Sequence, residues 1–384
     1  MRTMIIWSTV AGTMIEHTDE KERRMPVLTD LTEYGADESF FAEAALYPDR
    51  RLARITAQHK GLYKAMTNQG ETSAEISGRF RHGVTALSEY PAVGDFVMVS
   101  LPDATAGHAI IHHVLQRKSA FSRKAVGLEA QTQIVAANID IVFICMSLNH
   151  DYNVSRLERY LSVAWNSRAL PALILTKADL CADLSHILEE ISTIAPGVDV
   201  VATSINDQSS YDGLRSSLKP GITASFIGSS GVGKSTLINL LAGKDVLRTS
   251  RIGRNDKGMH TTTYRELLLL PQGGVVIDTP GMRELGAESA DVSQSFADIE
   301  ALATQCRFND CTHGAEPGCA VKQALETGRL DERRWANYQK LKREIRYHGL
   351  SSRQVETEKL NGMFENVGGM KKARAFLRNI DKRR

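Results

Sequence analysis

The sequence has little of several features that mark particular classes of protein. Its 384 residues include five cysteines, 6% aromatic residues and no internal repeat or low-complexity tract. So few cysteines exclude a disulfide scaffold, and no apolar run approaches the roughly 18 residues of a membrane span. The 42% hydrophobic and 24% charged residues exclude a disordered or collagen-like chain and fit a globular one of several domains.

Net charge is also nearly absent, at +2, but the charges are unevenly distributed. Residues 1–45 hold four basic and nine acidic residues. Residues 46–125 hold eleven basic and six acidic residues, and residues 331–384 hold fifteen basic and seven acidic residues. The two basic regions suggest faces that meet a polyanion, although a solvated surface would give the same pattern.

The first fifteen residues, MRTMIIWSTVAGTMI, resemble a signal peptide only weakly. They contain a single Arg, and a charged stretch from Glu16 to Arg24 follows directly. We therefore expect a flexible extension or a non-native start before Met25, together with a cytoplasmic location and no membrane contact.

The rest of the chain divides into two regions with different patterns of apolar residues. Short apolar stretches separated by turns predict strands at 51–58, 61–67, 72–80, 95–101 and 108–116, which fit a small barrel such as an OB-fold. From Ile139, buried strands alternate with helices, which predicts a doubly wound α/β domain. Its strands are expected at 139–146, 172–175, 198–202, 223–227, 264–270 and 275–277, and its helices at 154–166, 184–194, 211–218 and 234–241.

The fold class predicted from these patterns of apolar residues is a multidomain α/β chain. It comprises an acidic, partly disordered extension over residues 1–45, an OB-fold-like barrel over 46–125, an α/β domain over 126–289 and a mostly helical domain over 290–384.

The strongest motif is a G-x-x-x-x-G-K-[ST] sequence that begins at Gly228, follows an apolar strand and opens a helix. Backbone N–H groups of such a loop surround phosphates, Lys234 would neutralise β- and γ-phosphate charge, and Ser235 would offer its hydroxyl to Mg²⁺. The residues assigned to this loop are Gly228, Ser229, Ser230, Gly231, Val232, Gly233, Lys234, Ser235 and Thr236.

A second motif indicates guanine. Thr176, Lys177, Ala178 and Asp179 form a T-K-x-D sequence at a strand end. The Asp179 carboxylate would accept hydrogen bonds from guanine N1–H and the 2-amino group, whereas adenine would leave this charge unpaired. Thr203 and Ser204, at the end of the next strand, resemble the weaker motif that supports guanine O6.

Two further segments are typical of nucleotide switches. Asp278-Thr-Pro-Gly281 ends a strand, so Asp278 would hold Mg²⁺ through water and the Gly281 N–H would sense the γ-phosphate. Residues 258–263 resemble switch I, and Thr262 is our choice to complete the Mg²⁺ shell.

Met282 stands where Ras-type enzymes carry a water-orienting glutamine, and a methionine cannot orient water. We therefore expect slow intrinsic hydrolysis, with positioning supplied by switch I or by a partner. His260 is the candidate within the chain, although it could equally be an ordinary loop histidine.

The order of these motifs is unusual, because the base-recognition segments precede the phosphate loop, which in turn precedes the switches. The parts of a Ras-like domain are complete but circularly permuted, which is feasible because domain termini usually lie close together.

A separate cluster has metal-ligand spacing. Cys306, Cys311, His313 and Cys319 supply three thiols and one imidazole within fourteen residues, which suits tetrahedral Zn²⁺. With all four positions filled by protein, a structural rather than catalytic site is predicted. Cys145 and Cys181 are expected to be inert packing thiols.

The permuted motif order and the Cys/His spacing together closely resemble the ribosome small-subunit-dependent GTPase A (RsgA/YjeQ) family, over nearly the whole chain from about Leu28. The resemblance implies an N-terminal OB-fold that binds RNA, a permuted GTPase domain with GTP or GDP and Mg²⁺, and a C-terminal domain with one structural Zn²⁺. It also implies GTP hydrolysis stimulated by the 30S subunit during late maturation of that subunit.

The partners that the resemblance implies are the 30S subunit and its 16S rRNA, with other assembly factors as further candidates, and we expect a monomer. Two alternatives stay open. A zinc-stabilised rRNA-binding assembly factor would have a weak or vestigial GTPase, although intact Lys234, Ser235 and Asp278 argue against it. A P-loop small-molecule kinase would need an acceptor pocket and a site that tolerates adenine.

Overall fold

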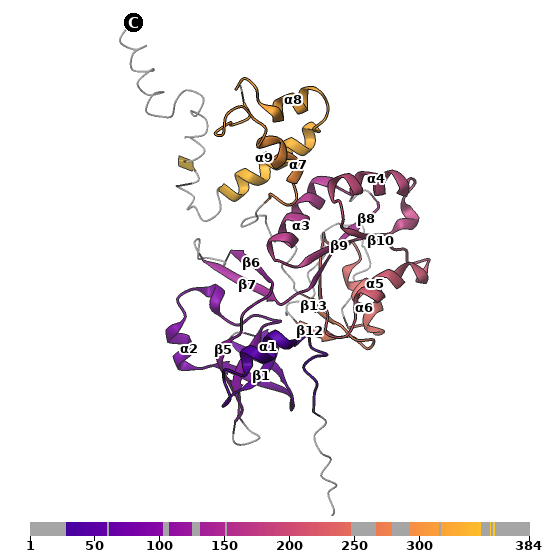
Figure 1. The fold of residues 1–384 in the computed structure, drawn as a ribbon. Helices are drawn as coiled ribbons and strands as arrows, with labels where there is room; N and C mark the ends of the chain where they lie inside the picture. Colours follow the sequence, from indigo (N-terminus) through magenta and orange to yellow (C-terminus); the bar gives the residue numbers. More distant parts are fainter. Residues whose placement is uncertain are drawn as a thin grey trace, which may run out of the picture.

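The computed structural model describes residues 28–59, 61–102, 107–124, 131–149, 152–246, 266–278, 292–314 and 316–346, together with 354, 356 and 357. A barrel and a C-terminal helical domain lie at opposite ends of the molecule, with an α/β domain beside them (Figure 1). No helix among the described residues is both long and apolar enough to cross a membrane.

The N-terminal domain is a closed barrel of five strands. These are β1 (Arg51–His59), β2 (Leu62–Thr67), β3 (Gly70–Ile76), β4 (Phe96–Ser100) and β5 (Ala109–Val114). Their order is β1-β2-β3-β5-β4, and β4 pairs back with β1 to close the barrel. The predicted barrel is therefore confirmed, and its interior is an apolar cluster that includes Ile55, Val97 and Ile111.

One predicted strand of the barrel is too long. The chain leaves β3 at Ile76 and forms helix α2 (Gly78–Gly83), because the Ser77 hydroxyl accepts a hydrogen bond from the Phe80 N–H at 3.0 Å. Such a cap stabilises the start of a helix and competes with extended structure. A short 3₁₀ helix, η1 (Leu87–Glu89), follows before β4.

Part of the acidic N-terminal extension is folded onto the barrel. Helix α1 (Glu38–Ala44) begins at Asp37, whose carboxylate accepts from the Ser39 N–H. Phe40 is buried against Phe96 of β4, with ring centroids 4.2 Å apart. Residues 1–27 lie outside the described residues.

The α/β domain contains a sheet with the order β10-β9-β8-β11-β13-β12. The first five strands are parallel and β12 is antiparallel to β13. The bounds are β8 (Ile141–Ser147), β9 (Leu170–Thr176), β10 (Asp199–Ala202), β11 (Thr223–Ile227), β12 (Glu266–Leu269) and β13 (Val275–Asp278). This arrangement confirms the predicted α/β domain and places the carboxyl ends of the central strands side by side.

Helices cover both faces of this sheet. One apolar cluster joins α3 (Val154–Asn166) and α4 (Leu184–Ile194) to one face, and a second joins α5 (Asp212–Ser217) and α6 (Lys234–Ala242) to the other. Cys145 is buried in the second cluster. Two 3₁₀ helices, η2 (Ala178–Leu180) and η3 (Gln208–Tyr211), follow β9 and β10.

A hairpin that the sequence did not predict connects the barrel to the α/β domain. It consists of β6 (Ala120–Lys124) and β7 (Thr132–Ala137), which pair antiparallel. The boundary predicted between residues 125 and 126 lies outside the described residues. The boundary predicted at residue 290 lies outside the described residues.

The joint between the barrel and the α/β domain contains a buried cation. Arg54 of β1, 1% exposed, donates to the Gly94 carbonyl at 3.2 Å, to the Asn138 carbonyl at 3.1 Å and to Thr223 Oγ1 at 2.9 Å. Burial lowers the pKa of Arg54 to about 10, which leaves it charged at neutral pH. Because these acceptors come from both domains, the guanidinium fixes their relative position.

In the described part of the C-terminal domain, three helices surround an apolar cluster. They are α7 (Ala297–Ala303), α8 (Ala320–Glu326) and α9 (Glu332–Arg346). This agrees with the predicted mostly helical domain, and α9 lies against α3 of the α/β domain.

Candidate functional site

Three loops meet at the carboxyl ends of β9, β10 and β11. They are residues 228–236 after β11, residues 176–179 after β9, and residues 203–206 after β10. The parallel register of the three strands with β8 brings segments that lie far apart in the sequence to one edge. This is the position at which open α/β sheets bind ligands.

The phosphate loop is built on a glycine that no other residue could replace without strain. Gly228 has a φ of 144°, and a Cβ added there would lie 2.3 Å from the carbonyl oxygen of Cys145 on β8. Gly231 and Gly233 also have positive φ, which only glycine adopts readily. The loop then opens α6 at Lys234, whose ammonium donates to the Gly228 and Ser229 carbonyls, each at 2.6 Å.

The T-K-x-D segment is fastened to the phosphate loop by two hydrogen bonds. Thr176 Oγ1 donates to the Val232 carbonyl at 2.6 Å, and Lys177 Nζ donates to the Gly231 carbonyl at 3.1 Å. Lys177 itself has a left-handed φ of 57°. The two motifs predicted to hold base and phosphate therefore lie in direct contact.

The Asp179 carboxylate is held at both of its oxygens. Ser204 Oγ donates to Oδ1 at 2.7 Å, and Asn206 Nδ2 donates to Oδ2 at 3.3 Å. The Ala178 N–H also donates to the Thr203 carbonyl at 3.1 Å, which joins the loops after β9 and β10. Sequence reasoning found Thr203 and Ser204 but missed Asn206, and only its place two residues beyond Ser204 could have pointed to it.

Of the predicted switch residues, Asp278 lies among the described residues. Asp278 ends β13, which pairs in parallel with β11, so this carboxylate lies at the same edge of the sheet as the phosphate loop. His260, Thr262 and Gly281 lie outside the described residues.

A second residue that sequence reasoning missed touches the phosphate loop. Arg156, in the first turn of α3, donates from Nη1 to Ser229 Oγ at 2.5 Å. Nothing in the local sequence distinguishes Arg156 from other surface arginines, because this contact joins residues that lie 73 positions apart in the chain.

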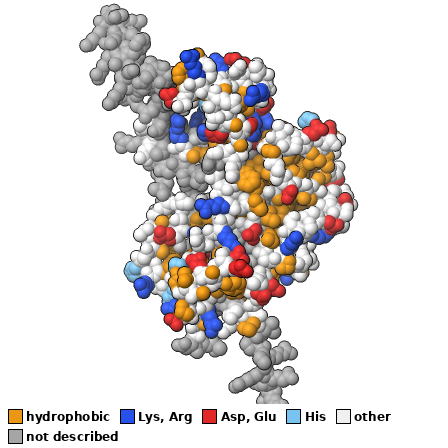
Figure 2. All heavy atoms as spheres, in the orientation of Figure 1, with side chains coloured by type: hydrophobic (Ala, Val, Ile, Leu, Met, Phe, Trp, Pro, Cys, Tyr) orange, Lys and Arg blue, Asp and Glu red, His pale blue; other side chains and the backbone are white. Residues whose placement is uncertain are grey.

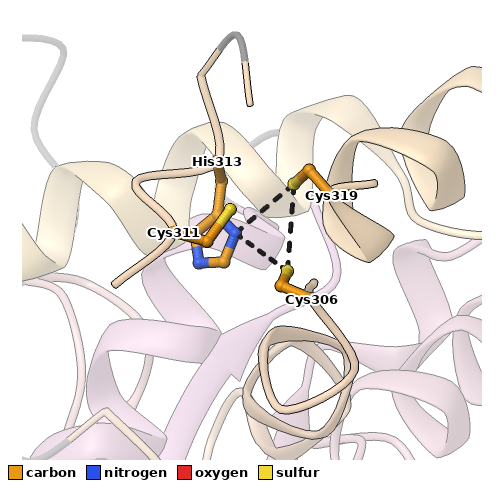
Figure 3. Close-up of side chains that lie close together, drawn as sticks. All are labelled: Cys306, Cys311, His313 and Cys319. Atoms are coloured by element: carbon orange, nitrogen blue, oxygen red, sulfur yellow. Dashed lines mark hydrogen bonds between the residues drawn. The ribbon is translucent and has the colours of Figure 1, made fainter. Parts of the chain in front are cut away.

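The Cys/His cluster forms one compact group of donors (Figure 3). The ligand atoms of Cys306, Cys311, His313 and Cys319 lie within 4.8 Å of one another. His313 Nδ1 is 3.5 Å from the sulfurs of both Cys306 and Cys319, which are 3.9 Å apart. Tetrahedral zinc with bonds of about 2.3 Å to sulfur and about 2.0 Å to nitrogen needs separations of this size, so the donor set fits zinc.

The backbone around this cluster is shaped to present the ligands. His313 has a left-handed φ of 62°, and the Glu316 carboxylate accepts from the Thr312 N–H at 3.0 Å and the Gly314 N–H at 2.8 Å. Burial and the neighbouring thiols raise the pKa of Cys311 to about 11. A bound cation would oppose this rise, because metal binding favours the ionised thiolate.

A buried ion pair joins the C-terminal domain to the α/β domain. Glu158 of α3, 0% exposed, accepts from Arg334 Nη1 at 2.7 Å and from Asn337 Nδ2 at 2.5 Å, both on α9. Arg334 also pairs with Asp298 of α7 at 2.7 Å. Burial raises the pKa of Glu158, and Arg334 opposes that rise. The same helix α3 therefore contacts both the phosphate loop and α9.

The Cys/His cluster contacts α9 through an aromatic side chain. The His313 ring meets Trp335 of α9 edge-on, with centroids 5.7 Å apart, and Trp335 stacks on Tyr338 at 5.5 Å. The fold of the cluster and the position of α9 are consequently linked by packing.

The exposed charge of the barrel is smaller than its sequence suggests. Arg54 is buried in the joint, and Arg117 pairs at 2.7 Å with Asp95, which is fully buried. On the face shown in Figure 2, basic and acidic side chains are interspersed over the barrel, and apolar side chains gather over the α/β domain.

The sheet topology, the phosphate loop and the base loops that precede it in the chain define a circularly permuted P-loop GTPase. Comparison with known proteins identifies the family. The family model described as RsgA GTPase matches residues 114–288. The chain is 46% identical over 346 residues to Small ribosomal subunit biogenesis GTPase RsgA 2 of Lactiplantibacillus plantarum, covering 90% of this chain and 97% of that protein. The chain belongs to the RsgA family, and it is a GTP hydrolase.

Other relatives agree with this assignment. Small ribosomal subunit biogenesis GTPase RsgA 1 of Listeria innocua is 45% identical over 322 residues, covering 83% of this chain and 90% of that protein. Among solved structures, YjeQ from Thermotoga maritima has a TM-score of 0.56 at 27% identity and covers 77% of this chain and 98% of its own. YloQ, described as a circularly permuted GTPase, has a TM-score of 0.56 at 25% identity, covering 77% and 95%.

Proposed function

We propose that this chain binds GTP at the edge formed by the three loops, hydrolyses it to GDP and phosphate, and couples that reaction to late maturation of the 30S ribosomal subunit. The observation that carries the proposal is the direct contact of the T-K-x-D segment with the phosphate loop through Thr176 and Lys177. In this arrangement one bound molecule spans a base-reading carboxylate and a phosphate-binding loop.

The residues take the following roles in this proposal. Asp179 reads guanine, Lys177 lies along the base, and Thr203 and Ser204 support guanine O6. Backbone N–H groups of the phosphate loop hold the phosphates, and Lys234 neutralises their charge. Ser235, Asp278 and Thr262 would hold Mg²⁺, which would neutralise charge on the phosphates.

The switch segment supplies the remaining roles. We assign Gly281 to sensing the γ-phosphate and His260 to positioning the attacking water, since Met282 cannot do so. Intrinsic turnover is then slow, and the subunit stimulates it. After hydrolysis the switches relax and the protein leaves the subunit.

The partner follows from the names of the relatives, which are called small ribosomal subunit biogenesis GTPases. We propose that 16S rRNA is the polyanion that meets the basic barrel and the basic C-terminal region. Phosphate contacts by lysine and arginine release counterions, so binding should weaken steeply with salt.

This docking predicts nucleotide-dependent retention on purified 30S subunits. In co-sedimentation, a non-hydrolysable GTP analogue should retain several times more protein than GDP, because only the γ-phosphate orders the switches. Raising the salt from 50 to 200 mM should release both forms, by the counterion-release argument. Equal retention with GDP and the analogue would refute the nucleotide switch.

We further propose that Cys306, Cys311, His313 and Cys319 hold one structural Zn²⁺. The purified protein should then contain one zinc per chain by elemental analysis. A strong chelator or Cys311→Ser should lower the thermal midpoint of the C-terminal domain, since structural zinc contributes folding energy directly. Cys181→Ser is the matched control because Cys181 lies outside the cluster. Zinc content unchanged by Cys311→Ser would contradict this assignment.

A further inference from the structure

The Asn206 side chain donates a hydrogen bond to Asp179, the residue that is expected to read the base. It lies in the loop after β10, two residues beyond Ser204, and its Nδ2 is 3.3 Å from Asp179 Oδ2. Both side chains are exposed, so their contact is not forced by burial. The other carboxylate oxygen, Oδ1, accepts from Ser204 Oγ at 2.7 Å.

The chemistry of a carboxylate explains what two such contacts achieve. An ionised carboxylate only accepts hydrogen bonds, and each oxygen has room for about two. Guanine presents N1–H and a 2-amino group side by side, so both oxygens must lie in the plane of the base. A donor fixed on each oxygen stops the carboxylate from rotating and leaves one acceptor site on each oxygen for the base.

The conformation of the loop that carries Asn206 is stabilised by hydrogen bonds that do not involve the Asn206 side chain. The Asn206 backbone N–H donates to Ser204 Oγ at 3.1 Å, and the Ser204 N–H donates to Ser210 Oγ at 3.1 Å. Asp207 Oδ1 accepts from the Ser209 N–H at 3.0 Å and begins η3. Removing the Asn206 amide therefore removes a contact to Asp179 and leaves the turn intact.

We propose that Asn206 is a positioning residue for guanine specificity, which with Ser204 holds the Asp179 carboxylate in the plane that accepts both N1–H and the 2-amino group. This inference rests on the proposed function, in that Asp179 reads guanine. It assigns to Asn206 a part in selecting bases that carry a 2-amino group.

The test compares GDP with inosine diphosphate, which keeps N1–H but lacks the 2-amino group. In Asn206→Ala, affinity for GDP should fall about three- to ten-fold, the size expected for one hydrogen bond to a charged group at an exposed site. Affinity for inosine diphosphate should change much less, because a single donor needs only one correctly placed oxygen. The GDP-to-inosine-diphosphate preference should therefore shrink.

Asp207→Ala is the matched control, since it alters the same loop without touching Asp179. It should keep the wild-type preference even if its thermal midpoint falls. A wild-type preference in Asn206→Ala would overturn the positioning role, and so would an equal loss of affinity for both nucleotides. A failure of guanine recognition itself is distinguishable, because the wild-type protein would then bind ADP as tightly as GDP.

Discussion

Replacing Lys234 by alanine is expected to lower single-turnover GTP hydrolysis by about 10²–10³-fold, the usual effect of removing one charged or hydrogen-bonding group that stabilises the transition state. Lys234 begins α6, and its ammonium lies inside the phosphate loop, 2.6 Å from the Gly228 and Ser229 carbonyls. In the proposed function, a cation held there would face the place where β- and γ-phosphate charge develops. Hydrolysis is measured at saturating GTP, so that a weaker affinity does not imitate a slower reaction.

Lys244→Ala is the matched control for this substitution. Lys244 follows the end of α6, is exposed, and carries the same charge away from the loop. Its loss should leave hydrolysis unchanged. If Lys234→Ala hydrolyses bound GTP at the wild-type rate, the phosphate loop is not where the reaction takes place.

Replacing Arg334 by alanine is expected to weaken the docking of the C-terminal domain on the α/β domain by about 3–5 kcal/mol, the cost of leaving a buried charge without its partner. Glu158 is fully buried, and its carboxylate lies 2.7 Å from Arg334 Nη1. In the variant this buried carboxylate would have no cationic partner. Arg334 also donates to the Ser295 carbonyl at 2.9 Å. Amide hydrogen exchange in α9 should accelerate about 10²-fold or more, because the free energy needed for local opening falls with the loss of docking free energy.

Arg333→Ala, on the next residue of α9, controls for the loss of a positive charge. Arg333 is 45% exposed and lies 3.8 Å from Glu190 and 3.6 Å from Asp331, so its pairs are worth less than about 1 kcal/mol. Exchange in α9 should therefore stay close to wild type. Comparable acceleration in both variants would show that the buried pair does not hold the joint.

Much of the α/β domain could be predicted because its signals are local. The continuous apolar run from Ile141 to Met146 indicates a strand buried on both faces, and β8 occupies Ile141–Ser147. The helices predicted at 154–166 and 184–194 have those bounds in the structure. The motifs were equally readable, because a phosphate loop needs glycines at fixed spacing wherever it occurs.

What escaped prediction depends on contacts between distant segments. Strands β6 and β7 stabilise each other by antiparallel pairing, and neither has a strong pattern alone. Arg54 looks like any strand arginine until Gly94, Asn138 and Thr223 converge on it. Glu158 likewise reads as an exposed helix residue, and it is buried only because α9 covers it with Arg334.

Charge counting had the same weakness. It treated every arginine of the barrel as surface charge, whereas Arg54 and Arg117 are engaged with internal acceptors. The proposal of an rRNA partner therefore draws on the names of the relatives as well as on the basic composition.

The most direct test of the central claim is GTP turnover measured with and without purified 30S subunits. The account predicts slow turnover by the protein alone and strong stimulation by the subunit, with Lys234→Ala inactive in both cases. Turnover that the subunit leaves unchanged, in a protein shown to bind GTP, would contradict the proposed coupling of hydrolysis to the small subunit.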